Sequence, residues 1–319
     1  MNRIIEKAAS IIVSGGTVAF PTETVYGLGA DARNEQAVAK IFAIKKRPEF
    51  DPLIVHIGSP DQAEHVAAEI PPEARRLMDQ FWPGPLTMIV RKRSSIPDLV
   101  TAGLPGVGIR MPDNPIALEL INSSHAAISA PSANSFGCIS PTCADHVRAD
   151  LGDAVDLIID GGCCDVGVES TIVSFMESRP TLLRPGGIAL EDIEEIIGTV
   201  HVPERDELKH ASPGRFSRHY APGTPLILTD TITELPEGKR MGLLTIGKPV
   251  EDAFFHRVEN LSPTEDLSEA ACNLFSALKR LDAAHLDLIV ATSVPDTGLG
   301  RAINDRLFRA SQKRDSFSG

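Results

Sequence analysis

The feature that most constrains the fold is the alternation of short apolar runs with helical segments through residues 1–198. Ile4, Ile5, Ala8, Ile11 and Ile12 recur at helical spacing, and Gly15-Gly16 ends that first helix. Strands interleaved with helices are typical of an α/β layered domain, which should end near Gly198 after a helix at 190–197. The predicted strands are Thr17–Phe20, Leu53–Ile57, Leu86–Lys92, Gly106–Arg110, Ala126–Ala130, Asp156–Asp160 and Ser170–Phe175.

The chain changes character at residues 199–224, which are polar, rich in proline and without a clear period. A structureless stretch of this length is unusual inside one compact domain, so we predict a linker there. Beyond it, "PLILT", "MGLLTI" and "LDLIVAT" predict strands, and helices are expected over "DLSEAACNLFSALKRLDAA" and "GLGRAINDRLFRAS". The predicted organisation is a first domain at 1–198, a linker at 199–224 and a small α/β domain at 225–319.

Composition narrows the class of protein. The 319 residues are 42% hydrophobic, enough for a sizeable core, and the formal net charge is −12. That charge disfavours a general nucleic-acid or anionic-membrane binder, because those partners need a basic face. The 5 cysteines form no paired CxxC motif, and no uncharged apolar window is long enough to cross a membrane. We therefore expect a cytoplasmic protein with weak or no direct nucleic-acid binding and no membrane association.

Polar and small residues gather where several predicted strands begin or end. Such places include "PTETVYGLG", "KKRPEFDPLIVH", "PGVGIRMP", "SAPSANSFGCISP" and "GVESTIV" together with "LLRPGG". Ligands of open α/β sheets bind beyond strand ends, and backbone amides with arginines suit phosphates. Each place also has an ordinary structural explanation: turn chemistry, complementation of a helix dipole, a hydrogen-bonded core histidine or a surface salt bridge. The residues alone thus predict a two-domain α/β protein with an anionic-ligand site.

Taken together and in order, these stretches resemble the YrdC-domain family of L-threonylcarbamoyl-AMP synthases, in the long form with an appended C-terminal domain. The order is "FPTETVYGLGADA", "KKRPEFDPLIVHI", "FWPGPLT", "GVGIRMPD", "SAPSAN", "GVESTIV", "LLRPGGI" and "SPGRFSRHYAPGTPL". The resemblance implies a YrdC-like domain with a twisted mixed sheet, joined by a long linker to a smaller Rossmann-like α/β domain. It also implies an enzyme that joins ATP, L-threonine and bicarbonate or CO2 into threonylcarbamoyl-AMP and releases pyrophosphate.

The resemblance further implies roles for individual residues. No residue is expected to be a covalent nucleophile, and Mg²⁺ is expected to bridge the ATP phosphates. A threonylcarbamoyl-transferase partner protein is expected to pass the product to tRNA. The residues expected at ATP are Lys45, Arg47, Asp51, Gly106, Ser132, Asn134, Ser140, Arg184 and Tyr220. The residues expected at L-threonine are Thr24, His56, Arg110, Ala130 through its backbone, and Ser170.

Two positions depart from the family pattern. Lys46 stands where a glycine is usual, and Asp51 stands where an asparagine is common. An aspartate close to a triphosphate would repel it unless a cation or backbone contact intervenes, which leaves open whether its side chain or backbone contacts ATP. In "PTETVYGLG" we expect Thr24 to offer polar groups to threonine, and Gly27 and Gly29 to let the chain fold tightly around the site.

Tyr220 lies in the predicted linker, and residues 212–224 also carry the donors Arg215, Arg218 and His219. We expect this segment to cover the site as a lid anchored by the C-terminal domain; the alternative is that the domain docks the partner enzyme. Two other functions stay open: an RNA-binding module without catalysis, which the −12 charge disfavours, and a related carbamoyl-adenylate-forming enzyme.

Overall fold

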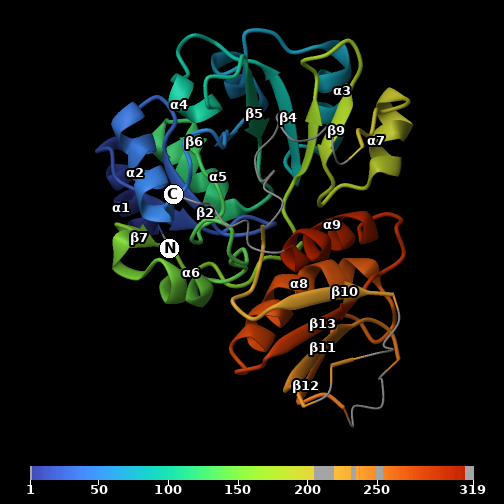
Figure 1. Cartoon of the computed structure of the whole chain (residues 1–319). Helices are drawn as coiled ribbons and strands as arrows, with labels where there is room; N and C mark the ends of the chain where they lie inside the picture. Colours follow the sequence, from blue (N-terminus) through green and yellow to red (C-terminus); the bar gives the residue numbers. More distant parts are fainter. Residues whose placement is uncertain (1, 205–218, 231–234, 237, 249–253, 313–319) are drawn as a thin grey trace.

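The computed structural model describes residues 2–204, 219–230, 235–236, 238–248 and 254–312, and contains two sheets (Figure 1). The larger sheet has 9 strands in the order β7-β1-β2-β6-β3-β5-β4-β8-β9 and mixes parallel with antiparallel pairs. This is the mixed α/β architecture expected from the sequence. Its strands are β1 (Val18–Phe20), β2 (Gly27–Asp31), β3 (Ile54–His56), β4 (Leu86–Arg91), β5 (Gly106–Arg110), β6 (Ile128–Ser129), β7 (Leu157–Ile158), β8 (Thr171–Ser174) and β9 (Thr181–Arg184).

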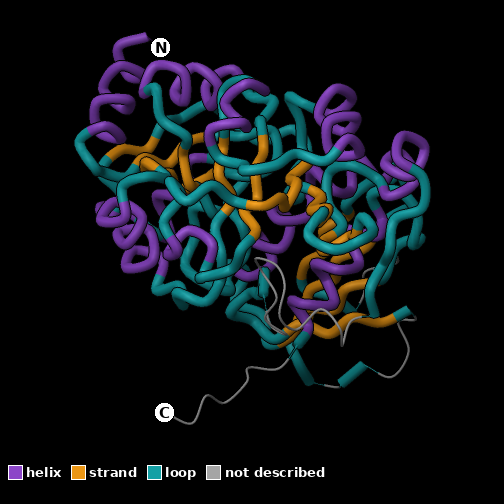
Figure 2. The backbone as a smooth tube through the Cα atoms, turned by 90° about the horizontal axis from the view of Figure 1, so that it is seen from above, coloured by secondary structure: helices purple, strands orange, loops and turns teal. Residues whose placement is uncertain are grey.

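Helices cover both faces of this sheet (Figure 2). Residues of β1 alternate between two cores: Ala19 belongs to the larger core, whereas Val18 and Phe20 pack with α1 and α5. The helices of this part are α1 (Asn2–Val13), α2 (Glu35–Lys45), η1 (Pro60–His65), α3 (Pro72–Phe81), α4 (Asp98–Thr101), α5 (Pro115–Ser124), α6 (Ala144–Asp150), η2 (Gly152–Ala154) and α7 (Leu190–Ile197).

The stretch around Gly27 and Gly29 differs from the prediction. It forms strand β2, antiparallel to β1, and is not a tight turn ahead of a helix. A Cβ on Gly29 would lie 2.6 Å from Ile128 and 2.7 Å from Phe20, so the glycine permits close packing within the sheet. Strands β9 and β12 were also not predicted.

The smaller sheet is wholly parallel, with 4 strands in the order β10-β13-β11-β12. Its apolar residues pack against two helices on one side, and a small separate cluster lies on the other. The elements are β10 (Leu226–Thr229), β11 (Met241–Thr245), β12 (Arg257–Asn260), α8 (Leu267–Asp282), β13 (Leu288–Thr292) and α9 (Gly300–Ser311).

The two parts share an apolar interface. Val25, Ile139 and Val168 of the first part belong to the same core as Leu274 and Phe275 of α8. A Cβ on Gly167 would lie 2.4 Å from the Cα of Cys272, so the first part approaches the backbone of α8 very closely. Within the described residues, no helix combines the length and apolar character that crossing a bilayer requires.

Candidate functional site

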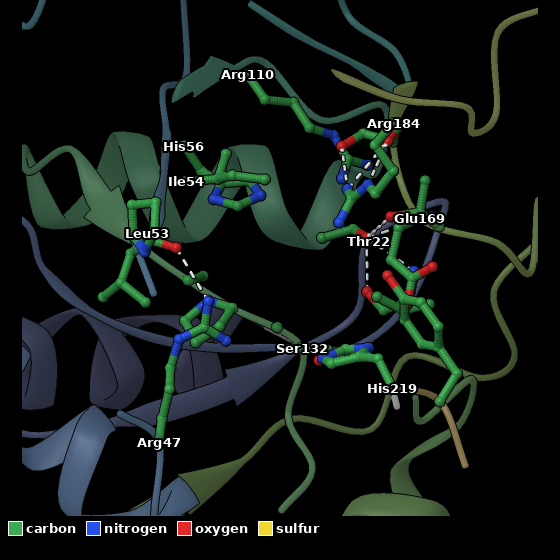
Figure 3. A pocket seen from close by; sticks show the side chains of 18 residues that line it. Thr22, Arg47, Leu53, Ile54, His56, Arg110, Ser132, Glu169, Arg184 and His219 are labelled. Carbon is green, nitrogen blue, oxygen red and sulfur yellow. Dashed lines mark hydrogen bonds between the residues drawn. The ribbon is translucent and has the colours of Figure 1, made fainter. Parts of the chain in front are cut away.

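A pocket lies where residues of the large sheet, the neighbouring loops and the segment 219–220 meet (Figure 3). Its cavity volume is about 60 Å³. The lining residues are Thr22, Thr24, Val25, Gly27, Arg47, Pro52, Leu53, Ile54, His56, Arg110, Ala130, Pro131, Ser132, Glu169, Ser170, Arg184, His219 and Tyr220.

One part of the lining, which we call the strand side, consists of Thr24, His56, Arg110, Ala130 and Ser170. His56 and Arg110 end β3 and β5, and they are direct partners in this parallel pair, so the register brings the two side chains together. Burial, and then the nearby Arg110 charge, lower the pKa of His56 to about 3. His56 is therefore a neutral imidazole at ordinary pH.

Arg110 is almost fully buried, and its Nη2 lies 2.6 Å from Oε1 of Glu23, which is also buried. Thr24 lies in a turn in which the hydroxyl of Thr22 accepts the amide of Thr24 at 3.2 Å and donates to the carbonyl of Val25 at 2.6 Å. This turn is built by side-chain to backbone bonds, as expected for a threonine-rich connection. It fixes the pocket wall beside Arg110.

The hydroxyl of Ser170, the residue before β8, lies 2.7 Å from that of Thr87 on β4. The guanidinium of Arg184 donates from Nη2 to the carbonyl of Ser170 at 2.9 Å and to its hydroxyl at 3.1 Å. Arg184 thus joins the strand side to the rest of the pocket. Burial lowers the pKa of Arg184 from its ordinary value.

A second part of the polar lining, which we call the loop side, consists of Arg47, Ser132, His219 and Tyr220; Thr22, Glu169 and Arg184 belong to neither side. Arg47 follows α2; its guanidinium donates to the carbonyls of Asp51 at 3.1 Å and Pro52 at 3.0 Å, and lies 2.9 Å from the Asp51 carboxylate. Arg47 is therefore a cation beside Asp51 that offsets the repulsion expected between this aspartate and a triphosphate. The Asp51 side chain itself does not line the pocket.

Lys45 is buried behind the loop side. Its Nζ donates to the carbonyl oxygens of Ser132, at 2.6 Å, and of Asn134. Burial, and then the charge of Arg47, lower the pKa of Lys45 to about 7. In this structure Lys45 therefore supports the 132–134 segment and does not line the pocket.

His219 and Tyr220 come from the predicted linker, and both are buried. The amide of His219 donates to the carbonyl of Arg309 on α9 at 3.4 Å, and the amide of Ala221 donates to that of Gly137 at 2.9 Å. Tyr220 has a positive φ of 59° and stacks on Phe275 with ring centroids 5.7 Å apart. The segment is thus attached to both parts of the chain. Arg215 and Arg218, also predicted for the lid, lie outside the described residues.

The structure brings most of the predicted residues together. All five predicted for threonine line the pocket, as do Arg47, Ser132, Arg184 and Tyr220 of those predicted for ATP. Ser140 and Asn134 lie behind the wall: the Ser140 hydroxyl donates to Glu169 at 2.6 Å, and the Asn134 amide donates to two nearby carbonyls. Gly106 begins β5, roughly 13 Å along the strand from Arg110, and does not reach the pocket.

The prediction omitted Thr22, Glu23, Glu169 and Arg306, and it named His219 only as part of the lid segment. Glu169 lines the pocket directly before Ser170 in "GVES", and Arg306 of α9 pairs with it at 2.8 Å. Burial opposes the charged form of Glu169, but Arg306 and Arg184 nevertheless hold its pKa below the usual value. A carboxylate alone would repel an anion, and the two neighbouring arginines, Arg306 and Arg184, explain how Glu169 can line this pocket.

Comparisons with known proteins show the family to which the chain is similar. The family model Sua5_yciO_yrdC, described as "Telomere recombination", matches residues 10–186, and Sua5_C, described as "Threonylcarbamoyl-AMP synthase, C-terminal domain", matches residues 188–312. A threonylcarbamoyl-AMP synthase of Pyrococcus abyssi is 43% identical over 97% of this chain and 94% of its own length. One of Bacillus subtilis is 44% identical over 97% and 93% respectively.

Among solved structures, that of P. abyssi Sua5 complexed with L-threonine superposes with a TM-score of 0.90 at 42% identity, covering 98% of this chain and 95% of the other. Both family models, the full-length relatives and the two-sheet architecture agree with one another. The chain belongs to the threonylcarbamoyl-AMP synthase family, in its two-domain form.

Proposed function

We propose that the pocket condenses L-threonine, bicarbonate or CO2, and ATP into threonylcarbamoyl-AMP, with release of pyrophosphate. The observation that carries this proposal is the alignment of Arg110 with neutral His56 on adjacent strands, in a fold that superposes along its length on a threonine-bound relative. The uncharged imidazole adds no second charge beside Arg110, whose guanidinium offers donors for a carboxylate while one of its nitrogens lies beside Glu23.

On the strand side, Arg110 binds the threonine carboxylate as a planar fork. Its Nη2 lies beside Glu23, while its Nε has no hydrogen-bond partner among the described residues, so it retains a donor for an incoming carboxylate. Thr24, the backbone of Ala130 and the Ser170 hydroxyl complete the pocket around the amino acid. The tight packing of these residues favours a side chain as small as that of threonine.

The chemistry runs in two steps. The neutral threonine amine forms an N–C bond to CO2 or bicarbonate and loses a proton, giving a carbamate. With CO2 the proton is released, and with bicarbonate it leaves together with the hydroxide as one water molecule. A carbamate oxygen then attacks the α-phosphorus of ATP, and the bond from that phosphorus to the bridging oxygen of pyrophosphate breaks. Negative charge grows on the phosphate oxygens, so fixed cations contribute most there.

Arg47 of the loop side and Arg184, which joins the two sides, bind the phosphates, and Ser132 offers polar groups to the nucleotide. Lys45, Asn134 and Ser140 act from behind the wall by holding this loop and Glu169 in place. Asp51 acts through Arg47, whose guanidinium it orients. Tyr220 covers the nucleotide and helps to exclude water from the labile product. A contact from Gly106 would require ATP to extend along β5.

We propose that Mg²⁺ binds through the ATP phosphates and neutralises the pyrophosphate leaving group. Within the described residues no cluster of three or more His, Cys, Asp or Glu could hold a metal. The nearby carboxylates of Asp51 and Glu169 are each paired with an arginine. Phosphate oxygens are therefore the natural ligands for a hard cation here.

We also propose that a partner transferase in the cytoplasm passes the threonylcarbamoyl group to a tRNA adenosine. For the chain itself we propose a catalytic domain at 1–198, a linker at 199–224 and a small domain at 225–319. The meeting of the two family matches at residues 186–188 supports two units, although His201 still pairs with Thr181 at the edge of the large sheet. Residues 205–218 of the linker lie outside the described residues.

The test is pyrophosphate release from ATP and bicarbonate, with and without L-threonine, followed by identification of the product by mass spectrometry. We expect release that depends on threonine and bicarbonate, with serine as a much poorer substrate. Carbamoyl phosphate is offered in a parallel reaction. Release supported by carbamoyl phosphate, and indifferent to threonine, would reject the proposal and favour carbamoyl-adenylate chemistry.

A further inference from the structure

Arg306 is the largest fully buried side chain in the described part of the chain, and its place is unusual. It belongs to α9 of the second part, yet its side chain is 0% exposed and reaches the residues that line the pocket of the first part. It is not itself a lining residue. Burying a guanidinium costs free energy unless nearby groups pair with its charge, and Arg306 has such partners.

The first contact is with Glu169. Nε of Arg306 donates to Oε2 of Glu169 at 2.8 Å, while the other carboxylate oxygen accepts the hydroxyl of Ser140 at 2.6 Å. Glu169 lines the pocket that we assign to two anionic substrates. Without Arg306 its carboxylate would be a buried negative charge facing the phosphates and would repel them.

The second contact is with Tyr220. The guanidinium carbon of Arg306 lies 4.9 Å from the centroid of the Tyr220 ring, within the range of a cation–π contact, and the ring also stacks on Phe275. Arg306 further donates from Nη1 to its neighbour Asp305 at 2.7 Å. One side chain of α9 therefore contacts both an acidic wall residue and the aromatic residue of the loop side.

We propose that Arg306 is a positioning residue for the synthase reaction: it neutralises Glu169 and holds Tyr220 in place over the nucleotide. This inference rests on the function proposed above. It assigns the second part of the chain a direct task in completing the ATP site, exerted through one guanidinium. The alternative is an ion pair that merely joins the two parts of the chain.

Arg301 provides a matched control on the same helix. Its Nη2 pairs with Glu191 of α7 at 2.9 Å, so this pair also joins α9 to the first part, but it is more exposed and lies away from the site pocket. Arg306→Met and Arg301→Met each remove one such cation. If joining the two parts were the only task, the two variants should differ in stability but not in substrate kinetics.

We expect Arg306→Met to raise the KM for ATP about tenfold, with less than about a twofold change in the KM for threonine, because a buried carboxylate is left unpaired at the nucleotide. Arg301→Met should retain both values. The double variant Glu169→Gln/Arg306→Met should recover most of the ATP effect, because it removes the uncompensated charge. A folded Arg306→Met enzyme with both KM values of the wild type would overturn the proposal.

Hydrogen exchange gives a readout independent of activity. The amide of Ala221 is bonded to Gly137, so its exchange reports whether the segment beside Tyr220 is held. Exchange of a peptide spanning 219–221 should accelerate in Arg306→Met and not in Arg301→Met; equal exchange in both would contradict the proposal. If the wild type fails to release pyrophosphate with threonine, the proposed function fails, while this measurement still tests the contact.

Arg306→Lys covers the case in which the methionine variant does not fold. Lysine keeps a charge for Glu169 but loses the planar group that lies over the tyrosine ring. We expect faster exchange at 219–221 and a rise of about threefold in the KM for ATP. A lysine variant identical to the wild type in both measurements would reduce Arg306 to a generic buried cation and reject the role at Tyr220.

Discussion

The strand side and the loop side of the pocket are built in different ways. His56 and Arg110 are neighbours because their strands are paired in register, and Ala130 and Ser170 directly adjoin strands β6 and β8. The loop side joins pieces that are distant along the chain, and two of them, His219 and Tyr220, are held by contacts with α8 and α9. The first side is set by one sheet, whereas the second depends on how two parts of the chain meet.

The two sides of the pocket also differ in backbone strain, judged by non-glycine residues with positive φ. Of the six non-glycine residues with positive φ in the described chain, Tyr220 is on the loop side and Lys46 adjoins Arg47. None belongs to the strand side. Such conformations are costly and persist only where surrounding contacts impose them. In the site that we propose, threonine therefore meets a surface formed by the large sheet, while the ATP surface also requires the second part of the chain.

The largest effect should come from the strand side. Arg110→Lys keeps a charge for Glu23 but loses the planar fork, and we expect the KM for threonine to rise about 100-fold, roughly 3 kcal/mol. Affinity for ATP, measured by calorimetry, should change less than about twofold. Equal weakening of both ligands in a folded variant would break the division into two sides.

Arg47→Lys tests the loop side in the opposite sense. The lysine cannot reproduce the contacts of the guanidinium with Asp51 and Pro52, so the KM for ATP should rise about tenfold while that for threonine is nearly unchanged. The control is Arg75→Lys, because Arg75 forms a half-exposed surface pair with Glu64. Wild-type turnover of the Arg47 variant at limiting ATP would show that Arg47 does not contact the nucleotide.

Two buried bases, Lys45 behind the loop side and His56 on the strand side, should make the stability depend on pH in different ranges. The pKa of Lys45 is about 7 in the folded chain and 10.5 when unperturbed, so between these values the unfolded chain binds the additional proton. The free energy of unfolding should therefore rise with pH across this window, by about 1 kcal/mol from pH 7.5 to 8.5.

Lys45→Met should remove this rise, which denaturant titrations at the two pH values would measure. His56 on the strand side, with a pKa of about 3, acts in an acidic window instead: its contribution is a loss of stability as the pH falls from 6.5 towards 3. Parallel pH profiles of the wild type and Lys45→Met between pH 7.5 and 8.5 would contradict the assignment of Lys45.

The smallest effect concerns the strain beside Arg47. Lys46 caps α2 in the left-handed conformation with φ of 52°, where glycine has no Cβ penalty. Lys46→Gly should raise the stability by about 0.5 kcal/mol, because relief of strain is partly offset by the entropy of the unfolded glycine. Ala39→Gly, inside the same helix, is the control and should lower stability. A destabilising Lys46→Gly would mean that the lysine side chain contributes more than its backbone costs.

The sequence nominated residues of both sides of the pocket but not Arg306, for a physical reason. Arg110 and His56 end apolar strands, where ligands of open sheets bind, and the family resemblance then implies that both bind threonine. Arg306 carries no such signal, because in "INDRLFR" it reads as an ordinary helical cation. Its burial depends on the packing of α9 against the first part, a non-local contact that no local pattern encodes.

Glycines illustrate the same limit. Gly27 and Gly29 were predicted to serve a tight fold around the site, but Gly29 makes room for Ile128 and Phe20 within the sheet. Position 46, where the family usually has a glycine, is the left-handed C-cap of α2, and in this chain a lysine adopts that conformation. The residue type marks such positions in the sequence, but the contacts that explain them are visible only in the folded structure.

Calorimetric titration of full-length Tyr220→Ala with L-threonine and with a non-hydrolysable ATP analogue tests the two-sided site most directly. Tyr220 belongs to the loop side and contacts Phe275 and Arg306 of the second part. We predict that affinity for the ATP analogue falls about tenfold while that for threonine stays within about twofold of the wild type. Equal losses for both ligands, or a loss for threonine alone, would contradict the account.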